Sequence, residues 1–123
     1  MIGYVTLGSN DLPRAIAFYD ALLGQGLGAA RIFESDRGVA WGVAPDKPGL
    51  GVMKPFDGQP ATRGNGTMVA VVMDSAAKVD SFYALALSLG ATDEGAPGQR
   101  APGFYAAYFR DLDGNKLNAF FMG

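Results

Sequence analysis

Asn118 is the most unusual of the few side chains in this chain that could do chemistry. It interrupts an apolar run formed by Leu117, Ala119, Phe120 and Phe121, where a strand is expected to bury its side chains. A buried amide without partners costs about 1–3 kcal/mol. We therefore expect Asn118 to open on a wet cavity. The alternative is that the backbone, a water or a tyrosine hydrogen-bonds the amide.

Two carboxylates, Asp111 and Asp113, lie close together just before this strand. Paired carboxylates can carry out acid–base chemistry. Their segment, DLDGN, also contains the Asp-Gly pair typical of a hairpin turn. Our interpretation is that these carboxylates satisfy backbone donors in that turn.

Histidine and cysteine are both absent. Their absence excludes a histidine general base, a Ser-His-Asp triad, His-based metal sites, disulfides and thiolate zinc sites. The lack of cysteine also fits a reducing compartment.

The composition indicates one soluble globular domain, because 49% of the 123 residues are hydrophobic. No apolar run reaches about 18 residues, so no membrane span is expected. The N-terminal residues do not resemble a signal peptide, which favours the cytoplasm. The net charge is −2 and there is no basic stripe, so nucleic acid is not an expected partner.

The elements that must position these side chains follow from local patterns. In the first half, a helix is expected over residues 9–24, with Asn10 or Asp11 as its cap, Pro13 in its first turn and Gly24 at its end. Strands are expected at 2–8, 29–35, 37–43 and 50–56, followed by a polar connector at 57–66.

The second half repeats this order. Ser75 caps a helix over 75–90, and strands are expected at 66–74, 91–97, 103–111 and 115–121. A shift of 64 residues places Phe18-Tyr19 on Phe82-Tyr83. Such a period indicates two βαβββ units related by internal symmetry. The alternative is that the matching pairs arose by chance.

This double βαβββ order resembles that of the vicinal oxygen chelate superfamily, which comprises the glyoxalase, bleomycin-resistance and extradiol dioxygenase group. The likeness is carried by YVTLGSNDLPRAIAFYDALLG, GNGTMVAVVMD and GFYAAYFRDLDGNKLNAFF, and it covers nearly the whole chain. It implies an α+β fold in which two βαβββ modules pair into an eight-stranded, cup-like open barrel. The chain would then be one glyoxalase-like domain, with module one at about 1–56, connector 57–66 and module two at about 67–123.

Enzymes of this family hold a divalent metal in the cup. The resemblance places their ligands on Tyr4, Met68 and Asn118, with a fourth position near Val52 or Lys54. A phenol, a thioether and a neutral amide are not the donors that such metals prefer. We therefore expect no metal, no cofactor and no metal-dependent glyoxalase, fosfomycin-resistance or dioxygenase activity.

Strand alternation predicts what would line the cup instead. The expected lining is apolar and aromatic with a few polar points, as in small-molecule pockets. It comprises Tyr4, Thr6, Trp41, Met68, Ala70, Phe104, Ala106, Tyr108, Lys116, Asn118 and Phe120.

Simpler interpretations of single residues stay open. Met68 can be core filler, because methionine fits irregular gaps. Tyr4 and Tyr108 can stack on neighbours with wet hydroxyl groups. Trp41 can be a dimer contact instead of a pocket wall.

Three functions are compatible with this pattern. The first is a metal-free protein that binds a small, partly apolar molecule. The second is a metal-independent enzyme of lyase or isomerase type, in which a tyrosine is the acid and Asn118 donates to a developing oxyanion. The third is a structural homodimer whose cup is filled by its own side chains. The resemblance implies a homodimer in each case.

Overall fold

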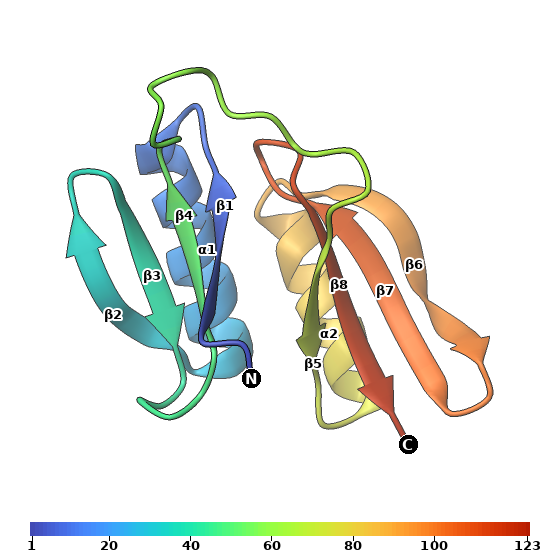
Figure 1. The fold of residues 1–123 in the computed structure, drawn as a ribbon. Coiled ribbons are helices and arrows are strands. Elements are labelled where there is room, and N and C mark those ends of the chain that lie inside the picture. The colour runs from blue at the N-terminus through green and yellow to red at the C-terminus, as the bar shows by residue number, and fades with distance from the viewer. The chain divides into compact units, whose positions relative to one another are not determined.

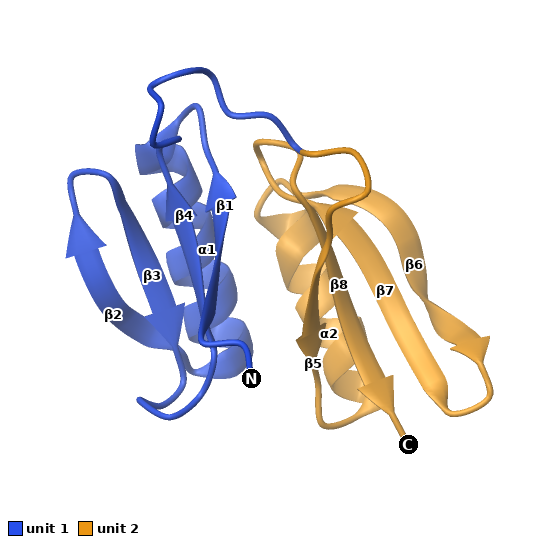
Figure 2. Ribbon diagram, in the orientation of Figure 1, with its two compact units in different colours: residues 1–63 blue, residues 64–123 orange.

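The computed structural model describes all 123 residues, which divide into two compact units, residues 1–63 and 64–123 (Figure 2). Each unit contains one helix and one four-stranded sheet in the order βαβββ (Figure 1). The predicted α+β class and the paired βαβββ order are therefore confirmed.

Unit 1 builds its sheet in the order β1-β4-β3-β2. Strand β1 runs parallel to β4, and the other neighbours are antiparallel. The elements are β1 Tyr4–Gly8, α1 Leu12–Leu27, β2 Ala30–Ser35, β3 Gly38–Gly42 and β4 Gly49–Met53.

Unit 2 repeats this topology with the order β5-β8-β7-β6, and β5 is parallel to β8. The same pairing pattern in both units gives the internal period a structural basis. The elements are β5 Val69–Val72, α2 Ala76–Ser88, β6 Thr92–Ala101, β7 Phe104–Arg110 and β8 Lys116–Met122.

The helix starts agree with the predicted caps. Asp11 accepts a hydrogen bond from the Arg14 amide, and Ser75 accepts one from the Lys78 amide. The predicted end of α1 at Gly24 is wrong. The helix continues to Leu27, and Gly28 ends it in the left-handed conformation (φ 68°). Neither helix is long and apolar enough to cross a membrane.

The predicted turn between β7 and β8 is also confirmed. The Asp111 Oδ1 atom accepts hydrogen bonds from the amides of Asp113 and Asn115, at 2.9 Å each. Gly114 takes the positive φ that the turn requires (90°). Asp111 is thus a turn-forming carboxylate.

In each unit the helix packs against one face of its own sheet (Figure 1). The buried side of α1 includes Phe18, Tyr19 and Leu22, and that of α2 includes Phe82. We call the opposite face of each sheet its open face, because no helix of its unit covers it. Burial of the helix side supplies the main stabilisation, since a buried Phe or Leu contributes about 1.5–3 kcal/mol.

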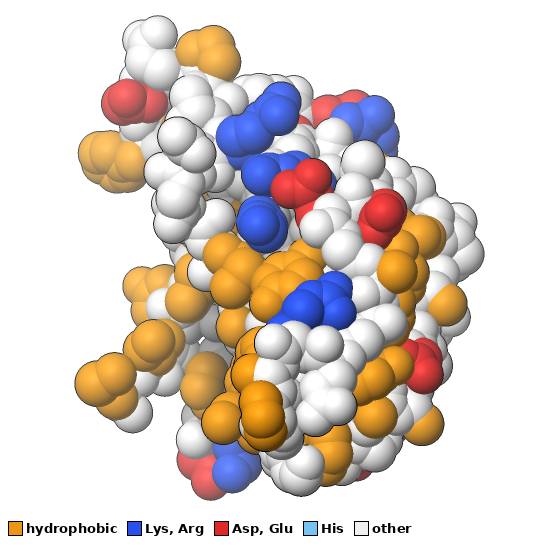
Figure 3. All heavy atoms as spheres, turned by 90° about the vertical axis from the view of Figure 1, so that its right-hand side faces the viewer, with side chains coloured by type: hydrophobic (Ala, Val, Ile, Leu, Met, Phe, Trp, Pro, Cys, Tyr) orange, Lys and Arg blue, Asp and Glu red, His pale blue; other side chains and the backbone are white.

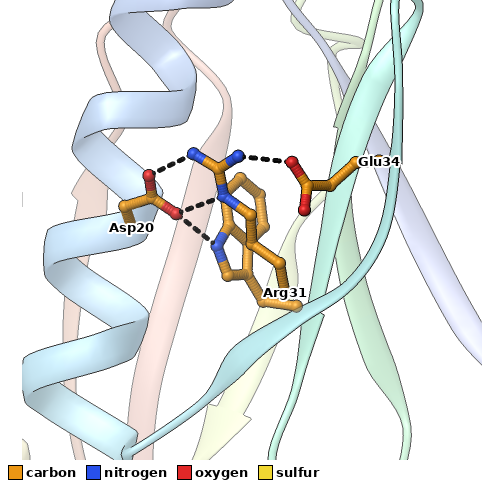
Figure 4. Close-up of polar contacts among 4 residues, drawn as sticks. Asp20, Arg31 and Glu34 are labelled. Carbon is orange, nitrogen blue, oxygen red and sulfur yellow. Dashed lines mark hydrogen bonds and ion pairs between the residues drawn. The ribbon is translucent and has the colours of Figure 1, made fainter.

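A polar cluster ties α1 to its sheet (Figure 4). The Asp20 carboxylate on α1 accepts hydrogen bonds from Arg31 on β2, at 3.0 and 2.6 Å, and from the Trp41 indole on β3, at 2.9 Å. Arg31 also contacts Glu34 at 2.7 Å. The Arg31 guanidinium, aided by Trp41 and opposed by partial burial, holds the pKa of Asp20 below its usual value.

This cluster predicts a stability difference that depends on pH. The pKa of Asp20 is lower in the folded than in the unfolded chain, so its contribution is present above about pH 3.9, the ordinary aspartate value. It is lost as the pH falls through the folded value. Asp20→Asn should therefore be less stable than wild type at pH 7, and the gap should narrow in acid.

Urea unfolding followed by fluorescence measures this gap, because Trp41 is the single tryptophan. Asp46→Asn is the matched control, since Asp46 is an exposed carboxylate outside the ion pairs. A gap between wild type and Asp20→Asn that stays constant from pH 7 to pH 3 would contradict the prediction.

Candidate functional site

The open face of the unit 2 sheet brings together most of the residues predicted to line a site. The strand register places Ala70, Asn118 and Tyr108 side by side, and it places Val72, Phe120 and Ala106 in the next row. The alternate residues Leu117 and Phe109 are fully buried on the helix side. The residues of one parity in β5, β7 and β8 therefore share one face of the sheet, opposite the side on which Phe109 packs against Phe82 of α2.

Aromatic rings dominate this face. The rings of Phe104 and Phe120 pack at 5.7 Å between centroids. The ring of Tyr108 has two cations near it, with the Arg100 guanidinium carbon and the Lys116 ammonium nitrogen each 5.4 Å from its centroid. Cations near an aromatic face are attracted by its negative potential. The face thus combines apolar rings with positive charge.

Asn118 does not open on a wet cavity. Its residue is 2% exposed, and its Nδ2 atom donates to the backbone oxygens of Ala107 and Ala119, at 3.0 and 3.3 Å. The alternative of a backbone partner is therefore the correct one. Because its donor group is committed to the backbone, Asn118 is not placed to donate to an oxyanion.

Met68 and Tyr4 are surface residues. Met68, just before β5, is 42% exposed, so the interpretation as core filler is wrong. Tyr4 on β1 is 70% exposed, and Thr6 lies two residues along on the same open face of unit 1. Tyr4 and Thr6 thus belong to the open face of one unit, and Met68, Phe104 and Tyr108 to that of the other.

Trp41 must be reassigned, because it is neither a pocket wall nor a dimer contact. It is 2% exposed, stacks near Tyr19 at 5.7 Å and donates to Asp20. Its contacts with Asp20 and Tyr19 put Trp41 on the side of β3 that packs on α1. Asp20 and Tyr19 both lie more than 20 positions from Trp41 in the sequence. Alternation within a short strand flanked by glycines therefore did not reveal which side Trp41 faces.

The positions that the family resemblance assigns to metal ligands do not fit a divalent metal. Tyr4 and Met68 offer a phenol and a soft thioether. Asn118 has its amide hydrogen-bonded to the backbone, and Val52 is fully buried. No group of three or more His, Cys, Asp or Glu side chains lies together anywhere in the chain.

A pocket of about 650 Å³ in unit 1 was missed by the sequence analysis. It lies where β1 and β4 end and the connector begins. Its walls come from these strand ends, the β2–β3 turn and the connector: Thr6, Leu7, Gly8, Arg37, Met53, Lys54, Pro55, Phe56, Asp57, Gln59, Pro60, Ala61 and Thr62. The sequence predicted only a polar linker for the connector. Its contact with Asn10 joins residues 51 positions apart, and local sequence patterns do not reveal such a contact.

The bonding of Asn118 yields a stability prediction. Asn118→Ala should lower the free energy of unfolding by about 1–3 kcal/mol, since it removes a buried, satisfied amide. Gln99→Ala is the control, because Gln99 is an exposed amide on β6 of the same unit. Urea unfolding at pH 7 measures both. Equal small effects of the two substitutions would show that the buried amide contributes nothing.

Comparisons with known proteins place this geometry in a family. The sequence model of the Glyoxalase/Bleomycin resistance protein/Dioxygenase superfamily matches residues 1–119. A glyoxalase/bleomycin resistance protein from Albidiferax ferrireducens T118 has 37% identity and a TM-score of 0.88, with 98% of this chain and 97% of that chain covered. The comparison with curated proteins gave no match.

More distant structures share the fold. A glyoxalase/bleomycin resistance protein/dioxygenase family enzyme from Burkholderia phytofirmans PsJN has 20% identity and a TM-score of 0.77, covering 96% of this chain and 95% of its own. A lactoylglutathione lyase from Agrobacterium tumefaciens has 21% identity and a TM-score of 0.72, covering 98% and 92%. The family match and the 37% identical structure together establish that this chain belongs to the glyoxalase/bleomycin resistance protein/dioxygenase superfamily.

Proposed function

We propose that this protein binds a small, partly apolar molecule on the open faces of its sheets, without a divalent metal. The observation that carries the proposal is the aromatic open face of unit 2, where Phe104, Tyr108 and Phe120 remain partly exposed. Small-molecule sites are mostly apolar and aromatic with a few polar groups. Membership of the superfamily supports the fold but not a particular reaction.

The surface around these rings supports this proposal. On the side of the molecule that carries β6 and β7, hydrophobic side chains gather with Lys and Arg side chains among them (Figure 3). Met68 and Val72 extend the apolar area along β5, at 42% and 67% exposed. Exposed aromatic rings offer flat apolar contact area, and the flexible thioether of a methionine can adapt to the shape of a ligand.

Binding is expected to depend on the open face and not on the helix side. Tyr108→Ala should weaken binding of a ligand found by a thermal-shift screen by up to about tenfold, because an aromatic contact contributes on the order of 1 kcal/mol. Tyr105→Ala is the control on the same strand, since Tyr105 donates to Asp80 on α2 instead. Calorimetric titration measures both dissociation constants.

Equal weakening by Tyr108→Ala and Tyr105→Ala would count against a site on the open face. If a thermal-shift screen of apolar metabolites and drugs finds no compound that stabilises the protein, the structural homodimer is favoured.

The metal-free part of the proposal rests on the donor set. Neutral and soft groups occupy the positions at which relatives are expected to hold their metal. Protein purified without chelator should contain substoichiometric zinc, manganese, nickel and iron by elemental analysis. One tightly bound divalent ion per chain would overturn this part.

We further propose that the protein is a cytoplasmic homodimer. The support is the family resemblance, the absence of cysteine and a set of exposed apolar side chains that includes Met1, Ile2 and Tyr4. Sedimentation equilibrium at micromolar concentration is expected to give twice the chain mass of 12.8 kDa. A monomer at all concentrations would exclude it.

A further inference from the structure

The pocket of unit 1 has walls that are ordered by the protein's own hydrogen bonds. Asn10 makes a reciprocal pair with Ala61, donating to its oxygen at 3.1 Å and accepting from its amide at 2.7 Å. A Cβ atom at Gly8 would meet the Ala61 side chain at 2.9 Å, so the connector lies directly on the end of β1. Because the connector is held at this point, the pocket exists without a ligand.

The turn in the connector is built in the same way. Gly58 has a φ of 75° and its amide donates to the Pro55 oxygen at 3.2 Å. The Asp57 Oδ1 atom accepts from the Gln59 amide at 3.0 Å. A preformed pocket loses less freedom on binding than a mobile loop would.

Two cations line this pocket, and neither forms an ion pair with a carboxylate. Arg37 donates one N–H to the Lys54 backbone oxygen at 3.1 Å, which leaves the rest of its planar donor set available. The Lys54 side chain is the second cation. Asp57 is the single carboxylate in the lining and is bonded to the Gln59 amide. The pocket therefore carries net positive charge in a chain whose net charge is −2.

Beside these cations is an apolar surface. The Arg37 guanidinium carbon lies 5.2 Å from the centroid of the Phe56 ring, which is 93% exposed. Met53 and Pro55 add further apolar walls. The volume of about 650 Å³ falls within the range typical of small-molecule sites.

We propose that this pocket binds a small organic anion, with its carboxylate or phosphate on Arg37 and Lys54 and its apolar body against Phe56. Arginine suits this role because its fork matches the oxygens of both groups. This pocket is separate from the open face of unit 2, so the proposal adds a second binding site, in unit 1, and names its ligand class.

Amide chemical-shift titrations of the full chain test this assignment. The probes are benzoate, phenyl phosphate and the neutral benzyl alcohol, which share one ring and differ in charge. We expect either anion to shift the amides of the non-proline residues in 54–62, and to bind several-fold more tightly than the alcohol. Tighter binding of benzoate indicates a carboxylate site, and tighter binding of phenyl phosphate indicates a phosphate-ester site.

Charge removal provides the second arm. Arg37→Gln and Lys54→Gln should each weaken binding of the anion by about three- to fivefold at low salt, as an exposed pair does. Added salt should narrow this difference. Lys47→Gln is the control, because Lys47 is an exposed cation of the same unit outside the pocket. Asn10→Ala should also weaken binding, by releasing the connector.

Several results would overturn the assignment. These are equal binding of the alcohol and the anions, no shift of residues 54–62 with either anion, or equal effects of Lys47→Gln and the two pocket variants. Ligand contact with the open face of unit 2 is observed separately, through the amides of β7 and β8. The wider function can therefore survive a failure of this inference.

Discussion

One helix covers one face of one four-stranded sheet, and the rest of this structure depends on that constraint. A sheet of this size needs a covered apolar face to be stable. Helix α1 supplies that cover with Tyr19 and Leu22, and α2 does so with Phe82. No element of the same unit is left to cover the second face. Large side chains there, such as Tyr4 and Val72, stay exposed, and the proposed binding of a small molecule relies on this exposure.

The register of the parallel pair β5 and β8 then decides which side chains share that surface. Ala70 and Asn118 are paired, with Tyr108 on the other side. A polar residue in such a row must find its partners in the backbone, and Asn118 does so through Ala107 and Ala119. A carboxylate could not donate in this way, so these hydrogen bonds depend on the amide. Asn118, which was predicted to be a site residue, thus links β7 and β8 of the sheet.

Much of this architecture follows from local sequence. The caps Asp11 and Ser75, the Asp-Gly turn before β8 and the alternation along β7 each depend on residues within a few positions of one another. The repeat of the whole order predicted the two βαβββ units. The predicted end of α1 was wrong because Gly24 and Gly28 both suit a helix terminus. The left-handed cap forms at Gly28, whose amide donates to the Gly24 oxygen.

The sequence by itself therefore determined the elements, their order and the facing of most strands, since each rests on short-range chemistry. Only the tertiary structure decided the partners of buried polar groups. Trp41 is buried because its indole donates to Asp20 and its ring contacts Tyr19, both on α1. The Asn118 amide donates to backbone oxygens of β7 and β8. The pocket beside Arg37 depends on the contact of Asn10 with Ala61, which lie 51 positions apart in unit 1.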